Sequence, residues 1–156
     1  NELTRAANIP IDPITNGAIV DENCQTQLPG IFACGNVLQV HDLVDFVSDE
    51  AERAGLGAAA FAIGQEKQSQ FIHTQPGNGV RYVLPQTIGS RDRDVDLFLR
   101  VTQPFGKVKF TVRDADTVLA VSKKLKAAPG EMERITLKAD ALKNAVGPIT
   151  VSLEEL

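Results

Sequence analysis

A chain of 156 residues is long enough for one ordinary domain or two small ones, and it needs no disulfide or metal to be stable. Apolar residues make up 43% and charged residues 23%, which excludes a chain that is disordered throughout. The net charge of −4 excludes general nucleic-acid binding, and no apolar run approaches the roughly 20 residues of a membrane span.

Charge and composition divide the chain into two halves. Residues 1–75 carry ten acidic and three basic side chains, a net charge of −7, whereas residues 76–156 carry a net charge of +3. A dense cluster of turn residues, Pro76, Gly77, Asn78 and Gly79, lies at the change. We therefore predict two domains, residues 1–75 and residues 76–156.

Two short apolar runs predict strands in the first half. Residues 17–20 form one run, and residues 31–34 form a second run that follows a turn at Pro29 and Gly30. A continuous apolar run that ends at a glycine, here Gly35, is typical of a strand buried on both faces of a parallel sheet.

A long helix is predicted after these strands. Asp42 is placed to act as the N-cap, Asp45 to reach back as in a capping box, and the pattern ends near Gly64. The residues expected to fall largely on one apolar face are Leu43, Val44, Val47, Ala51, Ala54, Ala58 and Ala62. Gly55 and Gly57 match a G-x-G-x-x-A pattern, but no strand precedes them, so close helix packing is the better interpretation.

The histidines and cysteines give no complete catalytic or metal site. His41 and Asp45 have a spacing that can chelate a metal, but no third ligand is near, so we expect a solvated or capping face. His73 is expected at the surface. Cys24 and Cys34 do not form a C-x-x-C pair and are expected to be reduced thiols in a cytoplasmic protein.

The second half alternates apolar and polar residues, which predicts an antiparallel sandwich or barrel. The expected strands are residues 80–84, 95–101, 107–113, 117–121, 134–138 and 149–153, with one helical turn at 140–144. No histidine or cysteine lies in this half. Its cations are read as the solvent face of a sheet, or else as a basic patch that docks on an acidic partner, either the first half or another subunit.

One motif in the first half resembles a known family. Residues 26–36, from Thr26 to Asn36, closely resemble the second FAD-binding motif of the pyridine nucleotide-disulfide oxidoreductases. Residues 15–21 resemble the strand that leads into this motif, and the resemblance covers about residues 1–64. Within the family, residues 34–45 look most like the NAD(FAD)-dependent dehydrogenases.

The resemblance implies which residues bind the cofactor. Gly35 would let the backbone approach FAD, and Asn36 stands where the family has an aspartate that accepts a hydrogen bond from the ribityl chain. The predicted helix start would face the flavin N1/O2 edge with its backbone N–H groups. The cofactor-binding residues implied in this way are Gly35, Asn36, Val37, Asp42, Leu43 and Val44.

The resemblance also implies a fold and a role. The fold class expected is α+β, with the C-terminal piece of an FAD-binding α/β domain followed by an Ig-like antiparallel sandwich. The first FAD motif, the NAD(P) domain and a redox C-x-x-C are not in this sequence, so we read the chain as a piece of a longer oxidoreductase. The expected partners are upstream FAD and NAD(P) domains of the same polypeptide, other oxidoreductase subunits or a second copy, and the chain alone is expected to be inactive. The alternative is a non-catalytic binding or scaffold module that uses the surface of the sandwich.

Overall fold

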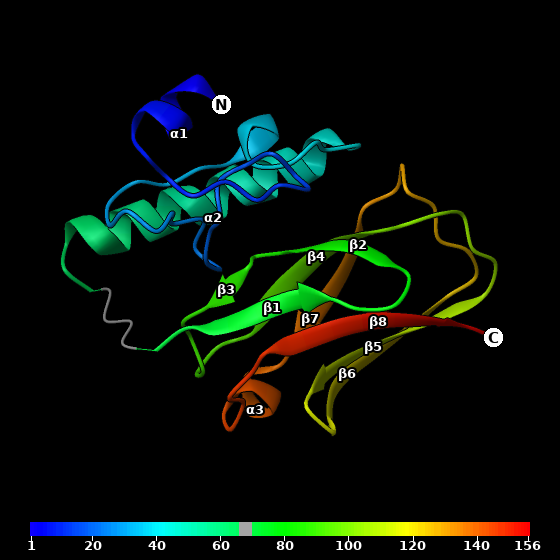
Figure 1. Ribbon diagram of the computed structural model, residues 1–156. Helices are drawn as coiled ribbons and strands as arrows, with labels where there is room; N and C mark the ends of the chain where they lie inside the picture. The colour runs from blue at the N-terminus through cyan, green and yellow to red at the C-terminus, as the bar shows by residue number, and fades with distance from the viewer. Residues whose placement is uncertain (66–69) are drawn as a thin grey trace. The chain divides into compact units, whose positions relative to one another are not determined.

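The chain divides into two compact units, Asn1–Ser69 and Gln70–Leu156, in a computed structural model that describes residues 1–65 and 70–156 (Figure 1). Among these residues the fold is mixed α+β and mostly β, with three α-helices and eight strands in two sheets. The domain boundary expected after residue 75 lies inside the first strand of the second unit, β1 (Ile72–Pro76). No helix in the described ranges is long and apolar enough to cross a membrane.

The first unit is built from three helical elements and extended loops. Its elements are α1 (Glu2–Ala6), the short 3-10 helix η1 (Gly35–Val37) and α2 (Val44–Ala62). The prediction of a strand at residues 17–20 is wrong, and so is the prediction that residues 31–34 form a strand of a parallel sheet. These residues form only isolated antiparallel bridges, Ile11 with Ala18, Val20 with Thr26 and Gln25 with Phe32. The apolar run is therefore only partly buried, and Ile31 is 40% exposed.

Helix α2 begins later than the capping residues predict. Leu43, with an extended backbone (φ −127°, ψ 138°), occupies the N-cap position, and no side chain caps the helix there. Asp42 is therefore one residue outside the helix boundary, and the prediction that it is the N-cap is wrong. The helix ends at Ala62, two residues before the predicted end, and Gly64 follows with a φ of +71°.

The buried face of α2 also differs from the predicted apolar face. The buried residues are Glu50, Ala54 and Gly57, which are spaced by four and three residues and so lie on one stripe. Leu43 and Val44, both on the predicted apolar face, are 56% and 76% exposed. The stripe is set by close backbone packing at Gly57 and by hydrogen bonds to Glu50, neither of which an apolar periodicity detects.

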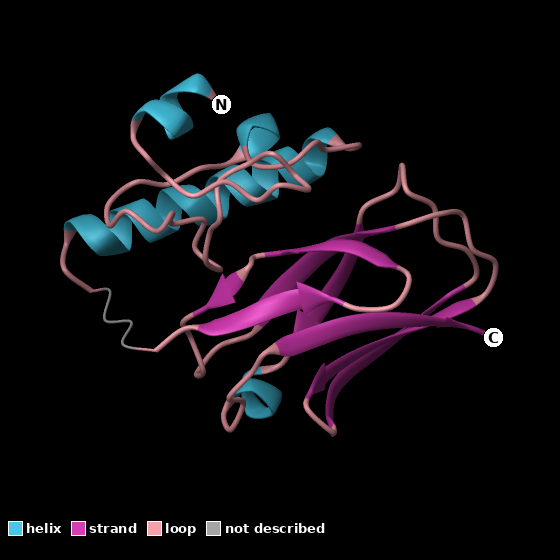
Figure 2. Ribbon diagram, viewed as in Figure 1, coloured by secondary structure: helices cyan, strands magenta, loops and turns pink. Residues whose placement is uncertain are grey.

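The second unit holds all eight strands, drawn in magenta in Figure 2. They are β1, β2 (Val80–Leu84), β3 (Thr87–Ile88), β4 (Val95–Val101), β5 (Val108–Asp114), β6 (Thr117–Lys124), β7 (Glu133–Leu137) and β8 (Ile149–Glu155). The strand order is β3-β1-β8-β5-β6 in one sheet and β2-β4-β7 in the other. A single helical turn, α3 (Ala139–Leu142), lies close to where a turn was predicted.

The strand pairs are antiparallel with one exception. The first and last strands, β1 and β8, run parallel, with Gln75 opposite Thr150, and Figure 1 shows them side by side. The prediction of a purely antiparallel sandwich is therefore wrong at this pair. Strands β1 and β3 were not predicted, because β1 is mostly polar and exposed and only its first residue, Ile72, is buried.

One apolar core is shared by the two sheets. The alternation in β5 buries Val108, Phe110 and Val112, and the whole buried cluster lies between Ile72 and Leu153. Leu97 and Leu99 of β4 belong to the opposite sheet and to the same cluster. The second unit is therefore a two-layer structure held by burial of aliphatic side chains.

Candidate functional site

The turn at Gly35 forms the centre of the candidate site. Gly35 has a φ of +76°, a conformation that favours glycine, and no atom would meet a Cβ built on it within 4 Å. The glycine is therefore required by the backbone conformation and not by crowding. It opens the 3-10 helix that carries Asn36 and Val37.

A buried carboxylate, that of Glu50, is hydrogen-bonded to this turn. The side chain of Glu50, 1% exposed, accepts hydrogen bonds from the Gly35 N–H at 2.6 Å and from Nε2 of Gln39 at 2.9 Å. Its Oε1 also lies 3.1 Å from Nε2 of His41. Three partners from residues 35–41 thus converge on one side chain of α2. Burial of a carboxylate is tolerated because its oxygens are paired in this way.

His41 is part of this cluster and not of a solvated face. Its side chain is 2% exposed, so the prediction that His41 and Asp45 form a solvated or capping face is wrong for His41. Its Nδ1 is buried and has no hydrogen-bond partner among the described residues. His73, in contrast, is exposed as predicted.

The sequence reasoning missed Glu50, although a signal for it existed. Glu50 is one of several acidic residues at the start of α2, and acidity alone does not distinguish it. It lies, however, four residues before Ala54 and seven before Gly57, on the stripe of small residues that a closely packed helix buries. A charged residue on that stripe indicates a buried, paired group.

Five of the six predicted cofactor-binding residues are exposed on one stretch of chain. Gly35 is half-buried, and the five exposed residues are Asn36, Val37, Asp42, Leu43 and Val44. The structure thus brings Gly35, Asn36 and Val37 together in η1. It places Leu43 at the N-cap position of α2 and Val44 at its first residue. Asp42 directly precedes Leu43, the residue at the N-cap position of α2.

Asn36 is oriented by a bond within the loop. Its Oδ1 accepts a long hydrogen bond, 3.4 Å, from the backbone N–H of His41. Its Nδ2 donates to no group in the part of the chain that the structure describes. The side chain therefore offers two N–H donors outward while its oxygen is engaged, which differs from the acceptor role that the resemblance implies.

Apolar side chains surround these polar groups. Val37, Val40, Leu43 and Val44 are 42%, 70%, 56% and 76% exposed. Four exposed aliphatic residues within eight positions, next to a helix N-terminus without a side-chain cap, form a surface suited to contact with another molecule or domain.

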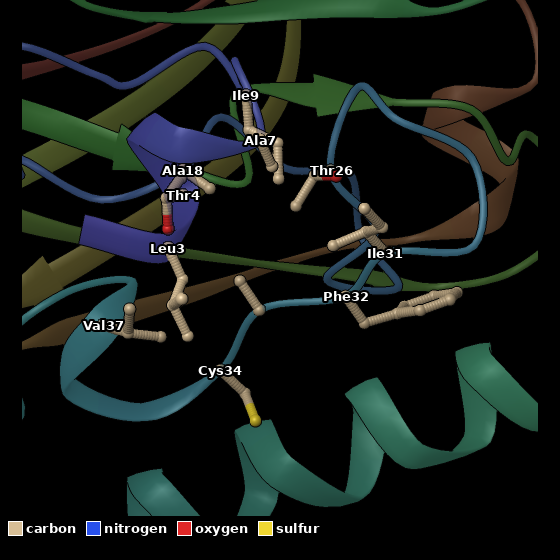
Figure 3. A pocket seen from close by; sticks show the side chains of 11 residues that line it. Leu3, Thr4, Ala7, Ile9, Ala18, Thr26, Ile31, Phe32, Cys34 and Val37 are labelled. Atoms are coloured by element: carbon tan, nitrogen blue, oxygen red, sulfur yellow. The ribbon is translucent and has the colours of Figure 1, made fainter. Parts of the chain in front are cut away.

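An apolar cavity of about 470 Å³ is lined in part by residues 31–34 (Figure 3). The residues that line it include Leu3 and Thr4 of α1 and also Ile31 and Val37. Figure 3 shows the sulfur of Cys34 pointing toward α2. The Phe32 ring meets the Phe61 ring edge to face, with centroids 6.3 Å apart.

The two cysteines are free thiols in different surroundings. Cys24 is buried and Cys34 is partly exposed. Burial, with a further contribution from the nearby Glu50 carboxylate, raises the pKa of Cys24 to about 12. Cys24 is therefore a protonated, unreactive thiol at neutral pH and has no role as a nucleophile.

Within residues 1–65 and 70–156, no group of three or more His, Cys, Asp or Glu side chains is arranged to hold a metal ion. Comparisons with protein-family models, with curated proteins and with solved structures found no match.

Proposed function

We propose that the chain is the C-terminal part of a flavin-dependent oxidoreductase that passes electrons between NAD(P) and a second substrate through FAD. The first unit would supply one wall of the FAD site, and the second unit would be a structural or interaction domain. FAD would also need a pyrophosphate cradle, and NAD(P) its own domain, from other parts of the same polypeptide.

The observation that carries the proposal is the surface formed by the exposed residues of this stretch, Asn36, Val37, Val40, Asp42, Leu43 and Val44. It combines N–H donors at Asn36 with backbone N–H groups at the start of α2 and four exposed aliphatic side chains. A flavin is a flat apolar ring system with polar atoms at one edge, and an apolar surface beside a helix N-terminus complements that pattern. The motif resemblance of residues 26–36 points to the same cofactor.

Asn36 provides the test of this proposal. In the full polypeptide, Asn36→Ala is expected to lower the flavin bound per protein by roughly fivefold to tenfold, as for the loss of one hydrogen bond of 1–1.4 kcal/mol. The control is Asn144→Ala, which removes an exposed asparagine of the second unit. Unchanged flavin content in Asn36→Ala would contradict the proposal.

The chain by itself provides a second test. We expect purified residues 1–156 to be colourless and to oxidise no NADH or NADPH, because the FAD pyrophosphate has no cradle here. A flavin absorption band in the purified chain would contradict this expectation.

For the second unit we propose an Ig-like sandwich in layer architecture. Two sheets with a common aliphatic core support this assignment, and the parallel pair β1–β8 departs from the simplest form. A non-catalytic interaction role for this unit is favoured by strand β6, which lies at the edge of its sheet. Val118 and Val121 on that strand are 46% and 53% exposed.

The interaction role has its own test. Val121→Lys is expected to abolish any association through β6, because a charged side chain on an edge strand opposes strand pairing. Sedimentation of the wild-type and variant chains measures the effect. A flavin content that depends on Asn36, together with identical sedimentation of both chains, would favour the oxidoreductase role over the scaffold role.

A further inference from the structure

One side chain of α2, that of Glu50, contacts three residues of the loop that carries the candidate site. Leu38, in the middle of residues 35–41, is fully buried, and its carbonyl would lie 1.8 Å from a Cβ at Gly17. Gly35, Gln39 and His41 all reach Glu50, and the Val37 carbonyl accepts a hydrogen bond from Nδ2 of Asn1 at 3.0 Å. The conformation of the loop thus depends on whether Glu50 presents hydrogen-bond acceptors.

Glu50 also determines what the Gly35 turn can bind. Its carboxylate accepts a hydrogen bond from the Gly35 N–H at 2.6 Å, so that N–H group is not available to a ligand. A negative charge directly behind the turn disfavours a phosphate at Gly35. The outward groups are the N–H donors of Asn36, which suit an uncharged acceptor such as a hydroxyl or carbonyl oxygen.

We propose that Glu50 is a positioning residue of the candidate site. By accepting from Gly35, Gln39 and His41 it fixes the turn so that Asn36 faces an uncharged hydrogen-bond acceptor of the cofactor. This inference rests on the proposed flavin-binding function. It adds that the carboxylate oxygens of Glu50, a residue of α2, control how tightly the candidate site binds FAD.

The variants are chosen to separate the acceptor role from simple packing. Glu50→Leu keeps the approximate volume and removes both of the acceptors that Gly35, Gln39 and His41 share. Glu50→Gln keeps one acceptor and lets Gln39 reorient its amide, so it is the conservative variant. Glu52→Leu, at an exposed position of the same helix, is the matched control for the change in charge.

The first measurement uses the chain itself. Amide hydrogen exchange at Gly35, followed by NMR, is expected to become at least about tenfold faster in Glu50→Leu, the change that corresponds to one lost hydrogen bond. Exchange at Ala54 and Gly57 in α2 is expected to stay the same, which a global loss of stability would not allow. Unchanged exchange at Gly35 would overturn the positioning role.

The second measurement uses the full polypeptide. Glu50→Leu is expected to raise the dissociation constant for FAD about tenfold, while Glu50→Gln restores most of the affinity and Glu52→Leu has no effect. If Asn36→Ala weakens FAD binding but Glu50→Leu does not, the flavin function stands and the positioning role is overturned. If the full polypeptide binds no FAD, the proposed function and the positioning role that rests on it are both overturned.

Discussion

At the residue scale, Cys24 combines an uncommon backbone with a buried thiol. Its φ is +63°, a left-handed conformation rarely adopted by residues other than glycine and asparagine. The carbonyl of Cys24 accepts from the Ala33 N–H, and its Sγ lies 3.9 Å from the Glu50 carbonyl oxygen. The residue therefore joins the loop before residues 31–34 to α2, and its ionisation is linked to the stability of the first unit.

The raised pKa of Cys24 predicts a loss of stability at alkaline pH. The pKa is about 12 in the folded chain and 9.0 as the reference value, so the folded state holds the proton more tightly. The stabilisation is fully present below about pH 9 and is lost as the pH rises toward 12. Between neutral pH and about pH 10, the free energy of unfolding of the first unit should fall by roughly 1.4 kcal/mol more in the wild type than in a Cys24→Ser variant.

Urea unfolding followed by far-ultraviolet circular dichroism, at neutral pH and at about pH 10, measures this difference. Lysine and tyrosine titration affects both proteins equally and cancels in the comparison. Cys34→Ser keeps Cys24 and should retain the full pH dependence. Equal pH dependence of wild type and Cys24→Ser would contradict the assignment.

A second buried carboxylate, Asp114, fixes a turn in the second unit. Its two oxygens accept from the N–H groups of Val146 at 2.8 Å and Gly147 at 3.0 Å. Asp114→Asn places an amide NH₂ against one of these donors, so we expect it to lower the free energy of unfolding of this unit by about 1–3 kcal/mol. Tyr82 fluorescence in urea measures the change, and Asp116→Asn in the exposed turn nearby is the control. Equal urea midpoints of unfolding for the two variants would show that the Asp114 carboxylate does not stabilise this unit.

At the element scale, α2 packs through a glycine. A Cβ at Gly57 would lie 2.8 Å from the Asn23 carbonyl oxygen and 3.1 Å from the Phe32 ring, whereas a Cβ at Gly55 would meet nothing within 4 Å. The close approach that the G-x-G-x-x-A interpretation expected is therefore present at one glycine of the pair. The other glycine faces open space and only weakens the helix.

The two glycines give a matched pair of variants. Gly55→Ala should stabilise the first unit by about 0.5–1 kcal/mol, because alanine favours the helix and meets no atom. Gly57→Ala should destabilise it by about 1–2 kcal/mol, because overpacking against backbone outweighs the same gain in helix propensity. Thermal unfolding followed by helical circular dichroism distinguishes the signs. Stabilisation by both substitutions would mean that the loop at Asn23 moves aside readily.

The elements differ in how far the sequence predicts them. The strands β4, β5 and β8 follow their alternation closely, because one face of each is buried in the core. Strand β1 escapes prediction because its pairing with β8 fixes its place and its own side chains do not. The Gly35 turn follows from the motif, but the role of Glu50 does not. The stripe of small residues on α2 signals that Glu50 is buried, but its hydrogen-bond partners depend on where residues 35–41 fold back, which no local pattern encodes.

At the scale of the whole molecule, the two units differ in the size of their cores. The buried apolar residues of the first unit, within residues 1–65, are Ile9, Ala18, Val20, Cys24, Leu38 and Ala54. The apolar cluster of the second unit is much larger and includes Phe110 and many aliphatic residues. Since burial of apolar surface is the main source of stability, the first unit should be the less stable of the two.

The chain carries its own probes for testing this difference. Tyr82 is the only tyrosine, there is no tryptophan, and Tyr82 lies in β2 of the second unit. The long helix α2 lies in the first unit, so helical circular dichroism reports mainly on that unit. On heating, we expect the helical signal to be lost at least about 5 °C below the change in Tyr82 fluorescence, because 1 kcal/mol shifts the midpoint of a small domain by about 4–8 °C.

Residues 70–156 alone provide the control for this prediction, because the described part of this unit contains its entire core cluster. This fragment should show the same Tyr82 transition as the whole chain, within about 2 °C, and almost no helical signal. Coincident transitions of the two probes in the whole chain would contradict independent units. A fragment transition many degrees lower would show that the first unit stabilises the second, and Gly57→Ala should then lower the Tyr82 midpoint of the whole chain as well.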